Sequence, residues 1–553
     1  MTRPWLAVVL ALTALSARAQ PVDAILTGGV IHTGDGPVEA LAWRDGLIVY
    51  VGPEAGLDTV ETGPDTQRIN LNGAVAFPGF VDAHVHLSGI GERELTLNLE
   101  GTASLADLLD RLAAHADGAP GDGAIVGRGW IETHWPDARF PTAADLDAAV
   151  PDRPVILVRA DGHAAVVNSA TLEAAAIDAG TPSPSGGEIL RDADGPATGM
   201  LIDKAMDLVA EVAATAEQIA PERALEEGGR VMVRQGWTGV HNMSVPFAQV
   251  PVMERLAEAG RLPIRVYNAI DRGDADVLFA GPVPRVGGSG RIVTRAVKVY
   301  ADGALGSRGA ALLAPYADRP DSRGLMLTDQ ASVQPLYERA LRQGVQIATH
   351  AIGDRANRAV LTWYAAAFDA VPPDQRAVAQ PRWRIEHAQI LTEVDIARLA
   401  RMGVIASMQP SHAIGDLHFA PARLGPERLA GAYAWADVIA AGGVIAGGSD
   451  APVERGSPLI EFYASVARKD LDGYQGAGWH PDQALTRETA LKLFTQWPAY
   501  AAFAETERGT LTPGTQADIS IFDRDLMTVP EPDILNARTV MTVVGGAVVF
   551  SAD

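Results

Sequence analysis

The sequence predicts an α/β protein: a (β/α)8 TIM-type barrel with a long insertion after strand 1, joined to a small β-sandwich formed from both termini. Eight short apolar runs recur in the middle of the chain, each followed by sequence of helical character. Both ends carry short strand-like runs with glycine turns instead. About 150 residues separate the first apolar run from the second, too many for a single crossover.

The eight apolar runs are the candidate barrel strands. Their near-continuous Val, Ile and Ala composition is typical of parallel strands that are buried on both faces, and alternation with helices favours parallel connections. Eight is also the number that a closed barrel of this kind needs. The expected strands span residues 76–86, 236–242, 263–270, 295–302, 345–352, 382–389, 404–410 and 443–450.

The domain boundaries follow from these patterns. We expect the barrel to span 76–507, with an inserted subdomain at about 101–204 that has a strand of its own at 154–159. The remaining segments, 20–75 and 508–553, alternate apolar and polar residues around turns such as Asp45-Gly46, which indicates hairpins.

Composition excludes several classes of function. The chain has 45 basic and 68 acidic residues and a net charge of −23, so nucleic acid and anionic membrane surfaces are not expected partners. It has no cysteine, which excludes disulfides, thiolate nucleophiles and thiolate metal sites. Any metal must therefore bind to imidazole, carboxylate or a modified lysine.

Residues 1–19 have the features of a cleaved signal peptide. Arg3 gives a positive start, residues 5–15 are apolar, and Ala17-Arg18-Ala19 is an A-x-A cleavage signal. The alternative, a membrane anchor, needs a longer apolar stretch. We therefore expect cleavage after Ala19, a periplasmic or secreted protein, and no membrane association afterwards.

Residues that can bind a metal stand at the ends of the expected strands. His84 and His86 are two apart on an extended segment, so both imidazoles project to one side. His350, His387 and Asp450 end three later strands. In a closed barrel these ends converge, which is where such enzymes place their active sites, and the pattern indicates a metal-dependent hydrolase.

These segments resemble the amidohydrolase superfamily, and within it the YtcJ-like (amidohydrolase type 3) group that includes N-substituted formamide deformylases. The resemblance covers nearly the whole mature chain. It is carried by PGFVDAHVH (78–86), DGHAAVVN (161–168), KVYADGALGSR (298–308), THAIGDRA (349–356), RIEHA (384–388), MQPSH (408–412) and GGSDAP (447–452).

The resemblance implies a centre with one or two divalent metal ions, zinc first, with Mn, Fe or Co also compatible. His84, His86 and Asp450 would bind the more buried ion, and His350 and His387 the more exposed one.

Lys298 occupies the position where many relatives carry a carboxylated lysine that bridges two metals. Beside cations a buried lysine is disfavoured as ammonium, and the neutral amine can take up CO₂ to form a carbamate. The alternative is an unmodified amine, paired with Asp302 or with substrate.

The catalytic interpretation follows from this centre. We expect Asp450 to accept a proton from the attacking water and to deliver it to the leaving group. His163, Arg308 and His412 are the candidate substrate-binding groups and oxyanion donors, and His163 belongs to an insert that would close over the barrel mouth as a lid. Trp130 is a further candidate for substrate binding, although core packing is the more frequent position of such a residue.

The sequence favours hydrolysis of an amide-like C–N bond in a small molecule, with ester, lactone or carbamate hydrolysis as the alternative. Deamination is disfavoured because Lys298 is present and because strand alternation predicts that Glu386 points away from His387. A non-catalytic binding protein on the same barrel would be expected to lack a ligand, and none is missing. The oligomeric state, a homodimer included, stays open.

Overall fold

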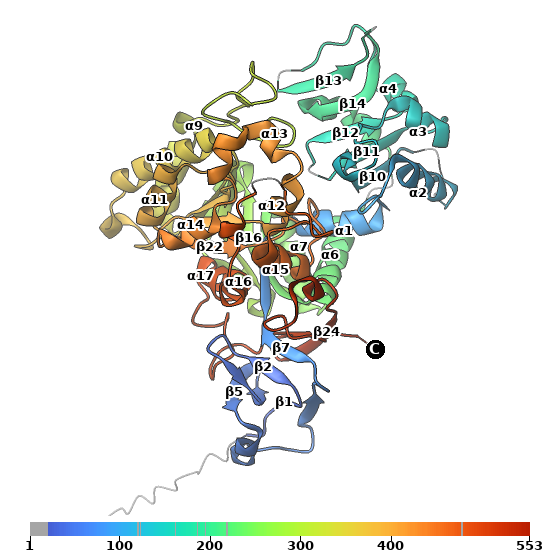
Figure 1. Cartoon of the computed structure of the whole chain (residues 1–553). Helices are drawn as coiled ribbons and strands as arrows, with labels where there is room; N and C mark the ends of the chain where they lie inside the picture. The colour runs from blue at the N-terminus through green and yellow to red at the C-terminus, as the bar shows by residue number, and fades with distance from the viewer. Residues whose placement is uncertain are drawn as a thin grey trace, which may run out of the picture.

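The computed structural model describes residues 20–552 except 119–120, 122, 161, 185, 194, 217–218 and 477–478. Figure 1 shows a central barrel, a β-rich part below it that contains the start of the described chain and its C-terminus, and a subdomain at the upper right. The expected signal peptide lies outside the described residues. Among the helices that the structure describes, none has the length and apolarity needed to cross a membrane.

The barrel is built from eight parallel strands in a nearly closed sheet, which confirms the predicted TIM-type architecture. Two backbone hydrogen bonds join its ends, Asp450 N to His84 O at 2.7 Å and His86 N to Ala451 O at 2.8 Å. In sheet order the strands are β8 (Phe80–Val85), β15 (Trp237–Val245), β16 (Arg265–Asp271), β18 (Ile292–Tyr300), β19 (Gln346–Ala351), β20 (Arg384–His387), β21 (Ile405–Met408) and β22 (Val444–Gly447).

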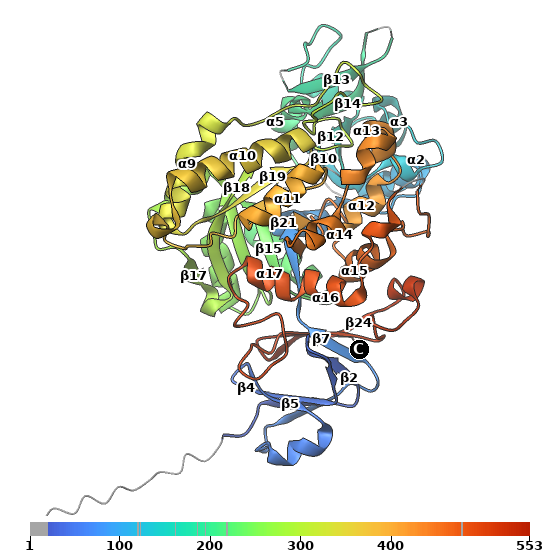
Figure 2. The same cartoon turned by 60° about the vertical axis from the view of Figure 1, so that its left-hand side comes forward.

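Helices surround this sheet on the outside (Figure 2). Local sequence fixes their ends: α9 starts where Asp329 accepts a hydrogen bond from Ser332 N and ends at Gly344, whose φ is 74°. The barrel helices are α1 (Leu87–Leu95), α6 (Pro221–Gln235), α7 (Val250–Glu258), α8 (Ala275–Phe279), α9 (Gln330–Gln343), α10 (Asp354–Ala370), α11 (Glu393–Met402), α12 (Pro410–Asp416), α13 (Ala420–Leu424), α14 (Trp435–Ala440), α15 (Pro458–Ala467), α16 (Arg487–Phe494) and α17 (Gln496–Ala501).

The expected first barrel strand, 76–86, is wrong as a single element. The structure divides it into β7 (Val75–Pro78), which pairs with β2 and β23, and β8, which pairs with β15. Gly79 lies at the break, where a Cβ atom would stand 2.3 Å from Thr238 Oγ1. Only glycine fits this close approach, which lets the chain pass from one sheet into the next.

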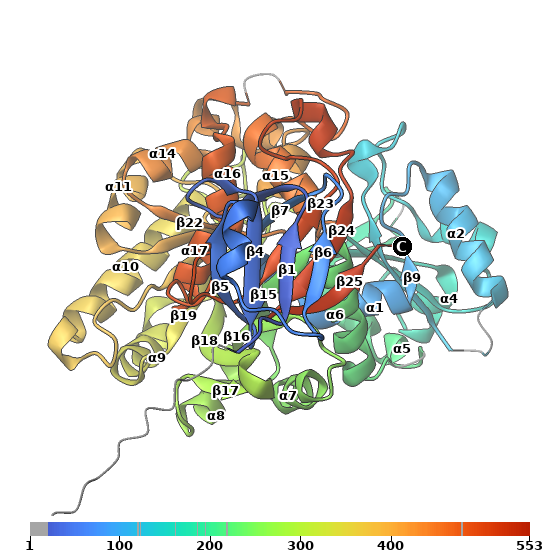
Figure 3. The ribbon, with the colours of Figure 1, turned by 90° about the horizontal axis from the view of Figure 1, so that it is seen from below.

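The chain ends form two further sheets. One has the order β5-β4-β1-β6 and the other the order β25-β24-β23-β7-β2-β3, so strands from both termini lie side by side (Figure 3). Trp43, Ile519 and Val543 share the core between them. These strands are β1 (Ala24–Thr27), β2 (Val30–His32), β3 (Pro37–Val38), β4 (Ala40–Arg44), β5 (Leu47–Gly52), β6 (Gln67–Asn70), β23 (Ile519–Phe522), β24 (Thr539–Val544) and β25 (Ala547–Ser551).

Between β8 and β15 the chain forms a separate six-stranded sheet. Its residues are buried on both faces: Leu157 belongs to one core cluster and its neighbour Ile156 to the other. The elements are β9 (Leu97–Asn98), β10 (Ile125–Trp130), β11 (Val155–Arg159), β12 (Ala164–Val167), β13 (Gly187–Arg191) and β14 (Ala197–Asp203), with helices α2 (Leu105–Gly118), α3 (Ala143–Ala149), α4 (Ser169–Ala174) and α5 (Ala210–Ala213).

Candidate metal centre

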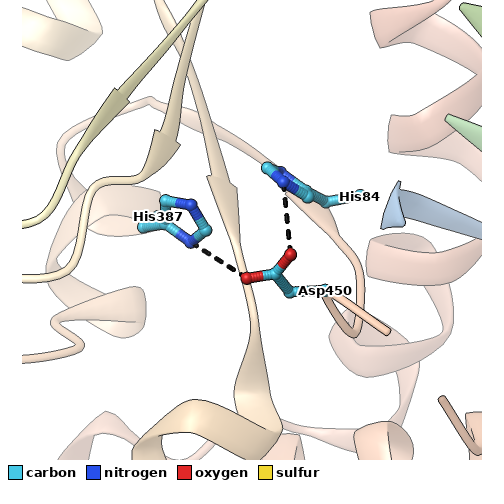
Figure 4. Close-up of side chains that lie close together, drawn as sticks. All are labelled: His84, His387 and Asp450. Atoms are coloured by element: carbon cyan, nitrogen blue, oxygen red, sulfur yellow. Dashed lines mark ion pairs between the residues drawn. The ribbon is translucent and has the colours of Figure 1, made fainter. Parts of the chain in front are cut away.

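Asp450 is the residue around which the other candidate ligands gather. Figure 4 shows its carboxylate between the rings of His84, which lies on β8, and His387, which ends β20. Asp450 Oδ1 is 3.5 Å from His84 Nε2, and Oδ2 is 4.0 Å from His387 Nδ1. All three side chains are buried. The C-terminal ends of strands far apart in the sequence thus place three candidate ligands within reach of one ion.

Two further histidines approach the same carboxylate. His86 Nε2 lies 3.2 Å from Asp450 Oδ1, and His412 Nε2 lies 3.7 Å from Asp450 Oδ2. The His412 ring, which belongs to α12, stacks on His387 with 5.8 Å between ring centroids. Four imidazoles therefore surround a single carboxylate.

His350 and Lys298 extend the cluster toward β18 and β19. The rings of His350 and His387 meet edge to face with 4.5 Å between centroids, and Lys298 Nζ is 3.2 Å from His84 Nε2. Asp302, the alternative partner for Lys298, instead accepts the backbone N–H groups of Ala311, Ile352 and Gly353 at 2.8 to 2.9 Å. Lys298 is thus next to the candidate ligands rather than paired with Asp302.

The backbone at two strand ends turns the ligands inward. His387 has φ of 72° and Asp450 has φ of 63°, values that cost free energy for any residue except glycine. The positive φ of His387 breaks the alternation along β20, so Glu386 and His387 both face the barrel interior. The expectation that Glu386 points to the opposite face is therefore wrong.

Glu386 accepts a hydrogen bond from the ring of His84. His84 Nδ1 lies 2.6 Å from Glu386 Oε2, with both side chains fully buried. Burial opposes ionisation of Glu386, but the guanidinium of Arg384 and the ring of His84 bring its pKa well below its ordinary value. Since an ionised carboxylate only accepts hydrogen bonds, Nδ1 of His84 carries the proton and Nε2 presents its lone pair to the cluster. Support of this kind orients a metal ligand.

Arg384 is the hub of this network. Its Nε donates to Glu386 Oε1 at 2.7 Å, Nη1 to His241 Nδ1 at 2.7 Å, and Nη2 to Ala83 O and Ser407 Oγ, each at 2.7 Å. No sequence signal marked Arg384 beyond its place in the RIEHA motif, because an arginine in a strand usually faces solvent.

The protonation states suit a divalent cation. Burial, and then the charge of Lys298, lowers the pKa of His84 to about 4, and burial brings the pKa values of His350 and His387 well below the ordinary value. Burial acts against ionisation of Asp450, but the surrounding histidines lower its pKa well below its usual range. Neutral imidazoles and an ionised carboxylate are the forms that bind metal.

Two polar atoms at the centre make no hydrogen bond among the residues that the structure describes. Asp450 Oδ1 and His412 Nε2 are buried, and neither has a hydrogen bond within the described part of the chain. Buried polar atoms without partners are rare and costly. Together with the nitrogen and oxygen donors around them, these atoms fit a bound divalent cation and its coordinated water.

The other predicted site residues lie farther out or elsewhere. His163, in the insert, pairs with Asp203 at 2.7 Å, and it is close enough to lower the pKa of His350. Arg308 makes an ion pair with Asp318 at 2.9 Å. Trp130 is fully buried in the core of the insert, where its indole N–H donates to Leu157 O. Its position favours core packing over a substrate wall.

A cavity of about 510 Å³ adjoins the centre, a size suited to a small molecule. Lys298, Tyr300 and Asp271 line it. The Tyr300 ring lies 5.4 Å from that of His350, and its hydroxyl meets Ser244. Neither Tyr300 nor Asp271 is predicted from the sequence as a site residue, although both stand at the C-terminal ends of strands, β18 and β16.

Comparison with known proteins assigns the family. The model of the amidohydrolase family (Amidohydro_3) matches residues 67–550. This chain belongs to the amidohydrolase family. It is 35% identical to YtcJ of Bacillus subtilis (strain 168) over 96% of this chain and 99% of that protein. It is also 27% identical to the N-substituted formamide deformylase of Arthrobacter pascens, over 92% and 94% of the two chains.

A solved structure agrees with this assignment. An uncharacterized metal-dependent hydrolase from Pyrococcus horikoshii superposes with a TM-score of 0.73 at 26% identity, over 92% of this chain and 99% of that one. The family and this likeness identify the chain as a metal-dependent hydrolase of the amidohydrolase superfamily that acts on small molecules.

Proposed function

We propose that the protein hydrolyses a C–N bond in an amide-like small molecule at the centre formed by His84, His86, Lys298, His350, His387 and Asp450. The observation that carries the proposal is the Asp450 carboxylate, which stands 3.2 to 4.0 Å from four imidazoles and has one oxygen without a hydrogen bond. A relative named for formamide deformylation supports the choice of bond.

A divalent cation bound by these residues, zinc in our proposal, supplies Lewis acidity that polarises a carbonyl and lowers the pKa of a coordinated water. The protein supplies the proton transfers. Asp450 is ionised, so it takes the proton of the attacking water and returns it to the leaving nitrogen. Water adds to the carbonyl carbon, the C–N bond breaks, and the products are a carboxylic acid and an amine.

His412 is the best-placed donor for the developing oxyanion. It adjoins Asp450 and is mostly buried, and burial lowers its pKa, so the ring is neutral and offers one N–H. His163 extends from the insert toward the same end of the barrel and is proposed as a substrate contact. Arg308 would have to leave Asp318 to reach substrate, which makes it the weaker candidate.

We further propose that Lys298 is carboxylated. Burial lowers the pKa of its ammonium to about 8, which favours the neutral amine that reacts with CO₂. Incubation with ¹³C-bicarbonate should give a carbamate signal in carbon NMR that Lys298→Met lacks. An unlabelled wild-type protein would contradict the carboxylation and leave the rest of the proposal standing.

The test of function is a substrate screen on the metal-loaded protein. N-formyl amines, N-acyl amino acids and cyclic imides should be hydrolysed faster than lactones or esters of matched size. The reverse order would support the alternative, ester, lactone or carbamate hydrolysis at the same centre. Asp450→Asn should fold normally yet reduce kcat by about 10²-fold or more, and normal turnover of this variant would exclude Asp450 as the proton carrier.

A further inference from the structure

A second cavity lies at the opposite end of the barrel from the metal centre. The N-terminal parts of β15, β16 and β18 line it together with α17. Figure 3 looks onto this end of the barrel, behind the sheet of β5, β4, β1 and β6. The cavity measures about 30 Å³, room for roughly two waters or for two oxygen atoms of one small ligand.

Three arginines line this cavity, and two of them make no side-chain hydrogen bond among the residues that the structure describes. Arg265 is paired with Asp518 at 2.7 Å and also donates to Gln516. Within the part of the chain that the structure describes, the guanidinium groups of Arg291 and Arg508 take part in no hydrogen bond or ion pair. Two forks of N–H donors thus border a space large enough for a small acceptor.

The charges around the cavity are unbalanced. Burial and the charge of Arg265 lower the pKa values of both Arg291 and Arg508. Among the described residues of the lining, Asp518 is the one carboxylate, and it is already held by Arg265 and by Gly545 N.

Two other titratable groups lie in or near the cavity, and neither neutralises the excess positive charge of the arginines. Glu507 attracts Arg508 but is not part of the lining. His241 lines the cavity as a neutral ring, since burial and Arg384 hold its pKa well below the usual value. Because a guanidinium does not lose its proton in a protein, the excess positive charge calls for an anion.

We propose that this cavity is a binding site for a small oxyanion, a phosphate or a carboxylate group, held between Arg291 and Arg508. Guanidinium groups bind both oxyanions through paired N–H donors, and the fixed Arg265–Asp518 pair forms one wall. The site lies away from the catalytic end, and its lining joins the barrel strands to α17 and to the segment before β23. The bound anion therefore stabilises the junction between barrel and sandwich and takes no part in hydrolysis.

Isothermal titration of the full-length protein with inorganic phosphate at constant ionic strength tests this site. We expect one phosphate per chain, and we expect Arg508→Gln and Arg291→Gln each to weaken binding at least tenfold. Acetate in a parallel titration distinguishes a carboxylate preference from a phosphate preference. The matched control is Arg234→Gln, an exposed arginine on α6 that should bind phosphate like the wild type.

Phosphate can also bind at a metal centre, so a second control separates the two sites. Asp450→Asn should keep the binding that Arg508→Gln loses. Phosphate should also raise the thermal midpoint of the wild type but not that of Arg508→Gln. Absence of binding, binding that both arginine variants retain, or binding lost only in Asp450→Asn would each overturn the proposal.

Discussion

Two adjacent layers of the barrel differ in how completely their polar groups are satisfied. The ligand layer consists of His84, His86, Lys298, His350, His387 and Asp450, with His412 beside it. The support layer beneath it consists of His241, Arg384, Glu386 and Ser407. In the support layer Arg384 has all its nitrogens hydrogen-bonded and both oxygens of Glu386 are occupied. In and beside the ligand layer, two buried atoms, Asp450 Oδ1 and His412 Nε2, make no hydrogen bond within the described part of the chain.

This difference between the two layers shows how the protein keeps buried polar atoms available to bind an ion. A buried polar atom without a partner is destabilising by about 1–3 kcal/mol, so such atoms persist only where the surrounding structure is fixed. The satisfied support layer fixes His84 through Nδ1, and Gln409 fixes His387 in the same way at 2.8 Å. Asp450 Oδ1 and His412 Nε2 are thus available to an ion, its water or a substrate.

The largest expected effect comes from breaking the support layer at its hub. Arg384→Met removes the cation that balances Glu386, which leaves a buried charge without its partner. Such a loss destabilises a protein by about 3–5 kcal/mol. Urea unfolding should show this as a large fall in the midpoint of the barrel transition.

The control for that variant is Arg230→Gln, which removes an exposed ion pair with Glu227. An exposed pair contributes about 0–1 kcal/mol, so this midpoint should hardly move. Equal shifts in the two variants would remove the distinction between the support layer and an ordinary surface pair.

A smaller effect is expected where the two layers meet. Glu386→Gln keeps the shape of the side chain but replaces the charged acceptor of His84 Nδ1 with a neutral amide. Loss of such a partner typically weakens metal binding by about 10- to 100-fold. Competition with a chromophoric chelator measures the dissociation constant directly, and an unchanged constant would show that Glu386 does not orient His84.

The smallest effect on stability is expected in the insert, whose residues contact neither the ligand layer nor the support layer and therefore serve as a reference. Asp145 caps α3 together with Thr142, and its hydrogen bonds to Arg139 and Thr142 lower its pKa from 3.8 to about 2. A carboxyl with a depressed folded-state pKa stabilises the fold above its unfolded pKa, and this contribution is lost as pH falls from 3.8 toward 2.

Thr142→Ala removes the N-cap of α3 and should therefore lower the free energy of unfolding by about 1 kcal/mol near neutral pH. The difference in stability between wild type and Asp145→Asn should shrink as pH falls below 4. Thermal melts across this range measure it. A difference that stays constant with pH would mean that the Asp145 carboxylate is not held as described.

Much of the fold and the ligand set could be predicted from the sequence. The signals are local: apolar runs with the composition of parallel strands, and His and Asp residues at their ends. A closed barrel brings the ends of its strands together, so these residues meet at one site. The support layer could not be predicted, because it depends on one backbone angle. Alternation along β20 predicts that Glu386 and His387 face opposite ways, and the positive φ of His387 reverses that result.

Two other differences have equally local causes. The expected strand 76–86 is split because Gly79 crosses from one sheet to another, and the close contact with Thr238 that requires this arises only in the folded chain. The indole N–H of Trp130 donates a hydrogen bond to Leu157 O within the insert, so the side chain belongs to the core of the insert. Sequence composition does not distinguish such a tryptophan from one that lines a substrate cavity.

The central claim is that the ligand layer binds a divalent cation that hydrolysis requires. The most direct measurement is metal content and turnover on the same samples, before chelation, after chelation, and after return of zinc. We predict one or two metal ions per chain, loss of turnover with the metal, recovery on its return, and reduced metal content in His387→Ala. A chelated, metal-free protein that hydrolyses its substrate at the original rate would contradict the account.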